Sequence, residues 1–170
     1  MANNCIYFVE GPCEEQLIKA LKEFPPLLAS GKVKIFNVVQ NLIPKSTLFT
    51  FTEGTTVILV FDTDVSKSSV LLRNINTLKK YCSKVKIVFF PQVLTLEDEL
   101  ERSTDVRKVT ELTKSKSTKD FKSDFCKLKP KECRNMLNKH KLNIHLLWET
   151  LAPKPFSFIQ NNGKEIKIFP

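Results

Sequence analysis

The sequence lacks any apolar run that approaches the roughly 18 residues a membrane-spanning helix needs. Its N-terminus lacks the basic residues and long apolar stretch that mark a secretory signal. Its five cysteines include no CxxC pair, and three of them lie in or beside apolar segments typical of buried free thiols. These absences argue against a membrane span and a disulfide scaffold, and we expect a soluble protein of the reducing cytoplasm.

Two further absences narrow the function. No segment resembles a Walker A phosphate loop, so any nucleotide-driven motor would have to be a partner protein. The only two tyrosines, Tyr7 and Tyr81, fall inside an expected strand and at the end of an expected helix. Neither is placed for the strand transfer that a topoisomerase performs.

Apolar runs alternate with helical periodicity through the first 93 residues. Strands are expected at 5–10, 33–39, 56–61 and 84–90, and helices at 13–24 and 69–81. The segment 41–52 is ambiguous, and a short helix interrupted at Pro44 would fit it. Strands joined by helical crossovers imply a parallel sheet covered on both faces. The prediction is an α/β, Rossmann-like core with a mainly parallel four-stranded sheet flanked by helices.

Residues 94–170 have a different character. We expect a helical, lysine-rich extension that packs on the 1–93 core, so that the chain forms a single compact domain. An acidic helix should begin at Leu96, and a second helix should run from about Lys131 to Leu151. A terminal hairpin is predicted to pair 156–159 with 166–169 around an Asn-Asn-Gly turn.

The formal charge of +9 is concentrated in one segment. Between Arg107 and Lys141 there are twelve basic residues against four acidic ones. Such a segment attracts polyanions through counterion release and favours a nucleic acid, DNA or RNA, as partner. A lysine-rich solvated face would give the same pattern. The residues predicted to contact phosphates are Lys114, Lys116, Lys119, Lys122, Lys127 and Lys129.

Acidic residues follow two of the expected strands. Glu10 comes directly after the first, and Asp62 and Asp64 come directly after the third. Both sets should emerge at the carboxyl edge of one parallel sheet, where open α/β sheets bind ligands. Converging carboxylates repel one another, and oxygen ligands suit Mg²⁺. The alternative is that Asp64 caps the helix that follows while Asp62 makes a turn hydrogen bond.

The order Val9-Glu10-Gly11-Pro12, Glu14-Glu15 and then Phe61-Asp62-Thr63-Asp64 resembles the Toprim domain of topoisomerases, primases, small ribonucleases and overcoming-lysogenization-defect nucleases. The likeness spans about residues 5–93, although Val65-Ser66-Lys67-Ser68 stands where many members have a glycine. It implies that Asp62 and Asp64 hold Mg²⁺ or Mn²⁺ and that Glu10 acts in acid/base chemistry or joins the metal shell. The compact size is similar to that of Toprim-like proteins of bacterial restriction and phage-defence loci.

The residues and the resemblance together favour metal-dependent hydrolysis of nucleic acid, because a divalent cation can activate water against a phosphodiester. Glu97 could add a ligand for a second ion, although acidic residues also favour helix N-termini. A haloacid-dehalogenase-type phosphatase fits less well, since its Asp-x-Asp motif follows the first strand. The competing hypothesis is a non-catalytic binding or regulatory module. Either form could act with an ATPase or as a homo-oligomer.

A second possible metal site lies in the basic segment. Two cysteines and two histidines are spaced as C-x6-C-x6-H-x4-H, and all four are residue types that bind zinc. The spacing is not that of a common zinc module, and Cys133 and His140 would share a helix face that could belong to the core. The four residues are Cys126, Cys133, His140 and His145.

Overall fold

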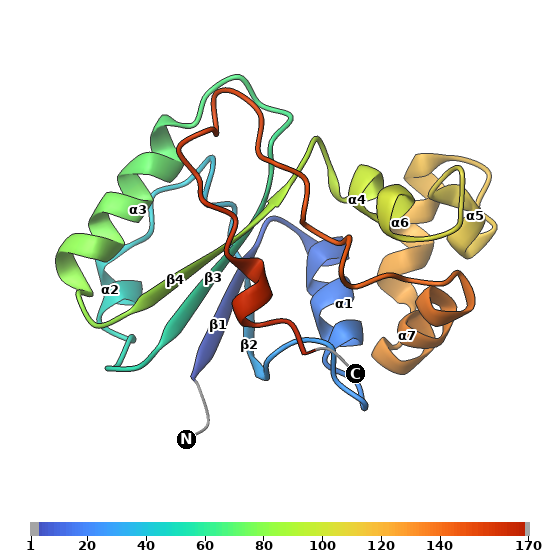
Figure 1. The fold of residues 1–170 in the computed structure, drawn as a ribbon, viewed down its shortest axis with the longest axis horizontal. Coiled ribbons are helices and arrows are strands. Elements are labelled where there is room, and N and C mark those ends of the chain that lie inside the picture. The colour runs from blue at the N-terminus through green and yellow to red at the C-terminus, as the bar shows by residue number, and fades with distance from the viewer. Residues whose placement is uncertain (1–3, 169–170) are drawn as a thin grey trace.

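The computed structural model describes residues 4–168 and contains one sheet of four parallel strands in the order β2-β1-β3-β4 (Figure 1). The predicted α/β class and the parallel sheet are therefore confirmed. The strands are β1 (Cys5–Val9), β2 (Gly31–Ile35), β3 (Thr56–Asp62) and β4 (Lys86–Gln92). The helices are α1 (Pro12–Leu21), α2 (Lys45–Leu48), α3 (Ser69–Tyr81), α4 (Leu96–Ser103), α5 (Thr110–Thr113), α6 (Thr118–Lys127), α7 (Pro130–Lys139) and the short 3-10 helix η1 (Gly163–Glu165).

Successive residues of the strands point to opposite faces of the sheet, where they are buried in two separate hydrophobic clusters. In β1, Tyr7 belongs to the cluster that α1 and α4–α7 cover, whereas Phe8 belongs to the one that α3 covers. Figure 1 shows α3 and α2 at one side of the sheet and α1 with α4–α7 at the other. Because both faces are covered, the strands read in the sequence as nearly continuous apolar runs.

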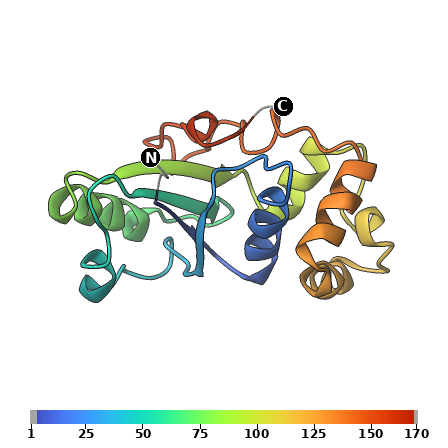
Figure 2. The same ribbon diagram turned by 90° about the horizontal axis from the view of Figure 1, so that it is seen from below.

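The C-terminal region packs against the same core that α1 occupies. Buried side chains of α6 and α7, among them Phe121, Phe125 and Leu137, share one hydrophobic cluster with Leu17 and Leu21 of α1. The view in Figure 2 shows α1 beside the bundle that α5, α6 and α7 form. No helix within residues 4–168 is both long enough and apolar enough to cross a bilayer.

The predicted helix from Lys131 to Leu151 is wrong at its C-terminal half, because α7 ends at Lys139. Lys141 takes a left-handed backbone conformation with φ 54°, and the N–H of Leu142 donates to the carbonyl of Leu137 at 3.0 Å. This is a helix-terminating turn. The N–H of Asn143 then donates to the carbonyl of Ser103 at 2.7 Å, which directs the chain back towards α4.

The predicted terminal hairpin is also wrong within the described residues, and Phe169 lies outside them. Instead, the side chain of Asn162 accepts from the N–H of Phe89 at 2.9 Å and donates to the carbonyl of Ile87 at 3.0 Å. Asn162 thus satisfies backbone groups of β4, the edge strand, in place of a paired strand. Gly163 follows with its Cα against the ring of Phe90, where a Cβ would collide with that ring.

Several element boundaries differ from expectation: α1 ends at Leu21 rather than at residue 24, β4 spans Lys86–Gln92 rather than 84–90, and β2 begins at Gly31 rather than at residue 33. The second strand ends at Ile35 rather than at residue 39, because the side chain of Asn37 accepts from the N–H groups of Val39 and Gln40 and turns the chain. The ambiguous segment contains the four-residue helix α2, which begins directly after Pro44. The predicted helix 69–81 is confirmed with both of its bounds.

Candidate functional site

The carboxyl ends of β1 and β3 bring Glu10 and Asp62 into direct contact. The backbone N–H of Asp62 donates to Glu10 Oε1 at 3.1 Å. The second carboxylate oxygen of Glu10 accepts from Asn37 Nδ2 at 2.9 Å. Residues that follow three neighbouring strands, β2, β1 and β3, therefore meet at one edge of the sheet, where sequence analysis placed the site.

Five acidic side chains form what we call the carboxylate cluster: Glu10, Glu14, Asp62, Asp64 and Glu97. Burial is the main cause that raises the pKa of Asp62 to about 9, and the negative charges of the other four members contribute to the same increase. Burial is also the main cause that raises the pKa of Glu10 to about 7; the hydrogen bond from Asp62 opposes the increase, and the charges of Glu14 and Asp64 make smaller contributions to it. The pKa of Glu14 is raised by its burial and by Glu97. The cluster thus holds more negative charge than the protein alone neutralises.

Asp62 carries the clearest sign of an incomplete environment. Its Oδ1 atom is buried and has no hydrogen-bond partner among the described residues. Asp64, by contrast, is exposed to solvent. The alternative in which Asp64 caps a helix does not hold, because α3 begins after Ser68 and no side-chain cap bond is made there.

Glu97 reaches the cluster from α4 and is held by a lysine of α6. Lys122 Nζ lies 2.9 Å from Glu97 Oε1, and this bond is the largest factor that raises the pKa of Lys122. Lys122 was predicted to contact nucleic-acid phosphates. The structure pairs it with Glu97 of the acidic cluster, and its side chain remains 58% exposed.

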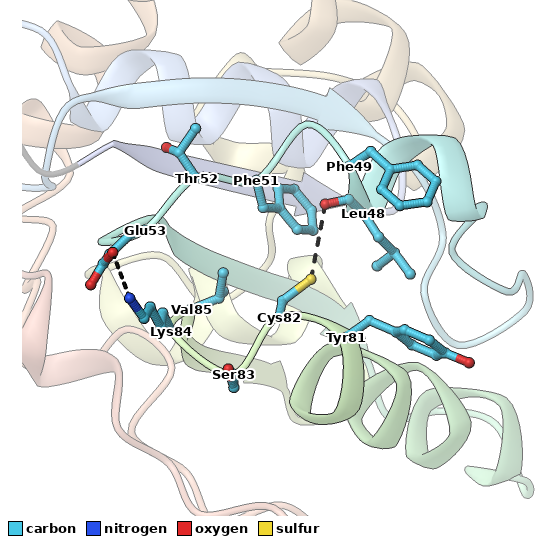
Figure 3. Close-up of a pocket in the computed structure, with 10 residues that line it drawn as sticks. All are labelled: Leu48, Phe49, Phe51, Thr52, Glu53, Tyr81, Cys82, Ser83, Lys84 and Val85. Carbon is cyan, nitrogen blue, oxygen red and sulfur yellow. Dashed lines mark hydrogen bonds and ion pairs between the residues drawn. The ribbon is translucent and has the colours of Figure 1, made fainter.

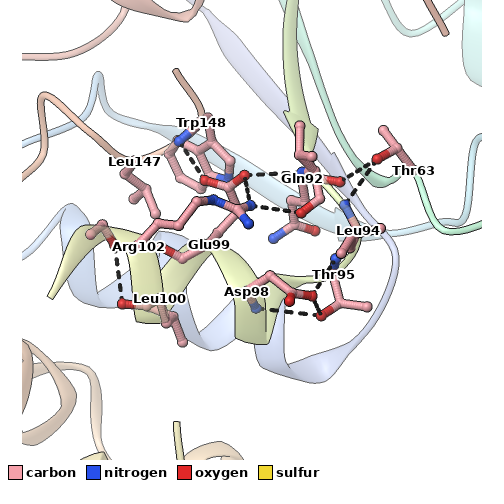
Figure 4. Close-up of polar contacts among 12 residues, drawn as sticks. Thr63, Gln92, Leu94, Thr95, Asp98, Glu99, Leu100, Arg102, Leu147 and Trp148 are labelled. Atoms are coloured by element: carbon pink, nitrogen blue, oxygen red, sulfur yellow. Dashed lines mark hydrogen bonds and ion pairs between the residues drawn. The ribbon is translucent and has the colours of Figure 1, made fainter. Parts of the chain in front are cut away.

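The neighbours of Glu97 have structural roles (Figure 4). Asp98 and Thr95 form a reciprocal capping box at the start of α4. Glu99 is fully buried and accepts from the N–H of Val93 at 2.9 Å, from the N–H of Trp148 at 2.9 Å and from Arg102 Nη2 at 2.6 Å. Of the three acidic residues in this run, only Glu97 faces the carboxylate cluster.

Two thiols lie beside the cluster at the contact between α1 and α6. The Sγ atoms of Cys13 and Cys126 are 2.9 Å apart, and both cysteines are free. Burial strongly raises the pKa of Cys13, and Cys126, Glu14 and Glu97 raise it further. Cys126 therefore has a half-buried thiol partner between α1 and α6 rather than the zinc site considered from its spacing.

Within residues 4–168 the structure contains no group of three or more His, Cys, Asp or Glu side chains arranged to hold a metal ion. This applies to the C-x6-C-x6-H-x4-H residues, of which Cys133 is buried in the core and His140 faces Asp105. It applies also to the carboxylate cluster, whose members are neighbours without surrounding one point. The donor set nevertheless suits a hard divalent cation, because it consists of carboxylate oxygens and includes the unpartnered Oδ1 of Asp62.

The lysines predicted to bind phosphates lie on α6 and in the turns that flank it, and all six are exposed. A shallow pocket of about 380 Å³ lies between the turn at 114–116 and α6 and is lined by Lys114, Lys116 and Lys127 together with Asp120 and Asp124. Lys127 Nζ lies 4.0 Å from Asp124 Oδ1. The basic segment is therefore a real exposed surface, partly balanced by its own carboxylates.

A different pocket, of about 310 Å³, lies at the opposite edge of the sheet, just before β3 and β4 begin (Figure 3). Its walls combine apolar side chains, among them Leu48, Phe51 and Val85, with polar ones. Its one carboxylate, Glu53, is paired with Lys84 at 2.8 Å. This pocket gathers no cluster of carboxylates, so it is not the candidate site.

Sequence analysis missed two members of the site. Glu14 lies one turn after Glu10 and was noted only as part of the motif, whereas the structure buries it beside Glu97. Asn37 follows β2, and its position just past a parallel strand was the signal that could have revealed it. Comparison with known proteins adds no further information, since no family model, curated protein or solved structure matches the chain.

Proposed function

We propose that this chain is a phosphodiesterase that cleaves nucleic acid with the help of Mg²⁺ or Mn²⁺. The observation that carries the proposal is the carboxylate cluster at the carboxyl edge of the sheet, which includes the buried and unpartnered Oδ1 of Asp62. Concentrated carboxylates without a counter-ion are costly, and a cation relieves that cost. The basic surface of α5 and α6 lies beside the cluster, as the Lys122–Glu97 bond shows.

The acidic residues would have two roles. Some would bind the cation, and one would accept a proton as general base. Asp62, Asp64 and Glu97 supply carboxylate oxygens suited to Mg²⁺, and Glu14 adds negative charge behind them. A bound divalent cation would supply charge stabilisation for the phosphate and a lowered pKa for water.

Glu10 is the candidate general base. Asn37 and the N–H of Asp62 fix its carboxylate by one hydrogen bond to each oxygen, which leaves a lone pair on each for a water molecule. A carboxylate held in this way is already oriented to accept a proton. Asp62 and Glu10 therefore have distinct roles that conservative substitutions can separate.

Lysines of the basic surface would position the nucleic acid. Lys114, Lys116, Lys119, Lys127 and Lys129 are exposed and can each pair with a backbone phosphate. Such contacts do not read the bases. The proposal therefore predicts an affinity that varies little with nucleic-acid sequence and falls strongly as the salt concentration rises.

A second candidate function is a non-catalytic nucleic-acid-binding module, alone or with a partner protein such as an ATPase. The observation that favours it is the Lys122–Glu97 pair, which already neutralises one carboxylate of the cluster. In this alternative the cluster would be inert, and the basic surface alone would act.

The deciding experiment is incubation of the purified chain with labelled DNA and RNA in Mg²⁺, Mn²⁺ or EDTA. The nuclease proposal expects metal-dependent cleavage that Asp62→Asn and Glu10→Gln each reduce by at least about a hundredfold, the scale of losing general acid–base or metal assistance. Glu53→Gln is the matched control, because Glu53 is an exposed carboxylate at the opposite edge of the sheet. Absence of cleavage, with salt-sensitive binding that all three variants keep, would support the binding module instead.

A further inference from the structure

A pocket of about 440 Å³ lies where the C-terminal end of α7 and the loop after it meet the loop that follows α1. It is distant along α1 from the carboxylate cluster, since Leu27 follows the C-terminal end of that helix and Glu14 lies in its first turn. None of the described lining residues is acidic. They are Leu27, Arg134, Asn138, Lys141, Leu142, Asn143, Ile144 and His145.

Arg134 is the unusual member of this pocket. Arg134 is only 7% exposed, and none of the ion pairs among the described residues includes it. Nη2 donates to the carbonyl of Pro25 at 3.2 Å, whereas Nε and Nη1 are buried and have no partner in the part of the chain described. Burial also lowers the pKa of the guanidinium. A dehydrated charge left without an anion is among the more costly features a protein can hold.

The other polar side chains of the pocket are one further cation, two amides and His145. Lys141 stands at the rim with a side chain 79% exposed, and its Nζ lies 3.3 Å from Asp105 Oδ2. The other oxygen of Asp105 lies 3.4 Å from His140 Nδ1, so the Asp105 carboxylate has two partners, Lys141 and His140. The side-chain amides of Asn138 and Asn143 add hydrogen-bond donors to the wall.

We propose that this pocket binds a phosphoryl group, with Arg134 as the anchor and Lys141 closing over the ligand from the rim. Guanidinium nitrogens suit two oxygens of a phosphate at once, and two cations without a lining carboxylate suit a dianion better than a monoanion. The volume exceeds that of phosphate alone and leaves room for an attached sugar. The ligand is therefore a phosphate monoester, either a free mononucleotide or the phosphorylated end of a nucleic acid.

The inference does not rest on the proposed nuclease activity. The test uses the full chain in EDTA, so that the carboxylate cluster has no cation to bind. Inorganic phosphate, adenosine monophosphate, adenosine, and oligonucleotides with a 5′-phosphate or a 5′-hydroxyl are titrated by calorimetry, and thermal unfolding is followed with each. We expect saturable binding by the phosphorylated compounds and none by adenosine.

Arg134→Gln and Lys141→Gln should each weaken that binding by at least about tenfold, the scale of one charge-assisted hydrogen bond. Lys116→Gln, an exposed lysine of the α5–α6 surface, is the matched control and should leave mononucleotide binding unchanged. Lys141 is exposed, so the Lys141→Gln variant decides the outcome if Arg134→Gln does not fold. Arg134→Lys provides a further check, because it keeps the charge and loses the bidentate contact.

The oligonucleotide arms distinguish the two sources of the phosphate. A preference for the 5′-phosphorylated oligonucleotide over adenosine monophosphate that Lys141→Gln abolishes would assign the pocket to nucleic-acid ends. Equal binding of both would assign it to a mononucleotide. Failure of every phosphorylated compound to bind, or binding that neither variant weakens, would overturn the proposal, while Asp62→Asn should bind these compounds as the wild type does.

Discussion

The backbone N–H of Asp62 donates to Glu10 Oε1 at 3.1 Å, so the last residue of β3 is joined directly to the residue that follows β1. The bond fixes the Glu10 carboxylate but leaves the Asp62 carboxylate buried beside it with an unpartnered oxygen. The Glu10 carboxylate thus receives a hydrogen bond from the backbone of Asp62. The Asp62 carboxylate has an oxygen that receives none. This imbalance leads to predictions about pH and divalent cations that can be tested without knowing a substrate.

The free energy of unfolding of the metal-free protein should fall as pH rises. Folding raises the pKa of Glu10 from its ordinary 4.5 to about 7 and that of Asp62 from 3.8 to about 9. Between about pH 4 and pH 9 the folded state therefore holds more protons than the unfolded state, and the slope of stability against pH is negative. We expect a loss of several kcal/mol, at about 1.4 kcal/mol for each pKa unit, measured by urea unfolding in EDTA. Asp62→Asn should flatten most of the slope, and an equal slope in both proteins would contradict the assignment.

A divalent cation should reverse that loss at pH 8. Millimolar Mg²⁺ or Mn²⁺ should raise the melting temperature of the wild type, because a ligand that binds only the folded state stabilises it by mass action. Asp62→Asn should be more stable than the wild type in EDTA, by about 1–3 kcal/mol, yet gain little from the cation. Glu53→Gln should respond as the wild type does. Stabilisation of all three proteins to the same extent would place the cation elsewhere.

The sheet and its acidic edge were predictable because both depend on local pattern. Apolar runs marked the four strands, and helical crossovers made them parallel, which placed Glu10 and Asp62 at one edge. The end of α7 was not predictable in this way, since it depends on the left-handed turn at Lys141 and on the bond from Asn143 to Ser103. The bond from Asn143 to Ser103 joins segments far apart in the sequence.

The same distinction explains the error in the tail and the unexpected contact of Lys122. An Asn-Asn-Gly sequence between two apolar runs is typical of a hairpin, yet Asn162 here pairs with the backbone of β4. Lys122 has the sequence context of a phosphate-binding lysine, yet the packing of α6 beside α4 places it on Glu97. A contact between side chains of two different helices cannot be predicted from the sequence around either residue.

Lys122 and Lys119 should separate two functions of α6. Lys122→Gln removes a positive charge from the carboxylate cluster and should tighten Mg²⁺ binding roughly fivefold, about 1 kcal/mol of charge repulsion. The same change should weaken nucleic-acid binding and reduce its salt slope by about 1. Lys119→Gln, also exposed on α6, should reproduce only the effect on nucleic acid. Identical behaviour of the two variants in Mg²⁺ titrations would show that the Glu97 contact has no electrostatic consequence.

Glu99 should be the acidic residue of α4 whose loss most affects folding. It is fully buried and joins three separate groups: Arg102 of its own helix, the N–H of Val93 after β4, and the N–H of Trp148 in the C-terminal segment. Glu99→Gln removes the charge that Arg102 faces and one of the acceptors, so we expect a loss of about 2–4 kcal/mol of unfolding free energy.

The fluorescence of Trp148, the only tryptophan, provides the measurement for this prediction, because its indole stacks on Phe90 with ring centroids 4.1 Å apart. Urea unfolding should shift to lower denaturant in Glu99→Gln with the folded-state spectrum also altered, since the Trp148 N–H loses its charged acceptor. Glu53→Gln, which alters an exposed ion pair, should change stability by less than about 1 kcal/mol. A Glu99→Gln protein as stable as this control would mean that Arg102 and the two N–H groups find water once the charge is gone, and that the C-terminal segment is held by the packing of Trp148 alone.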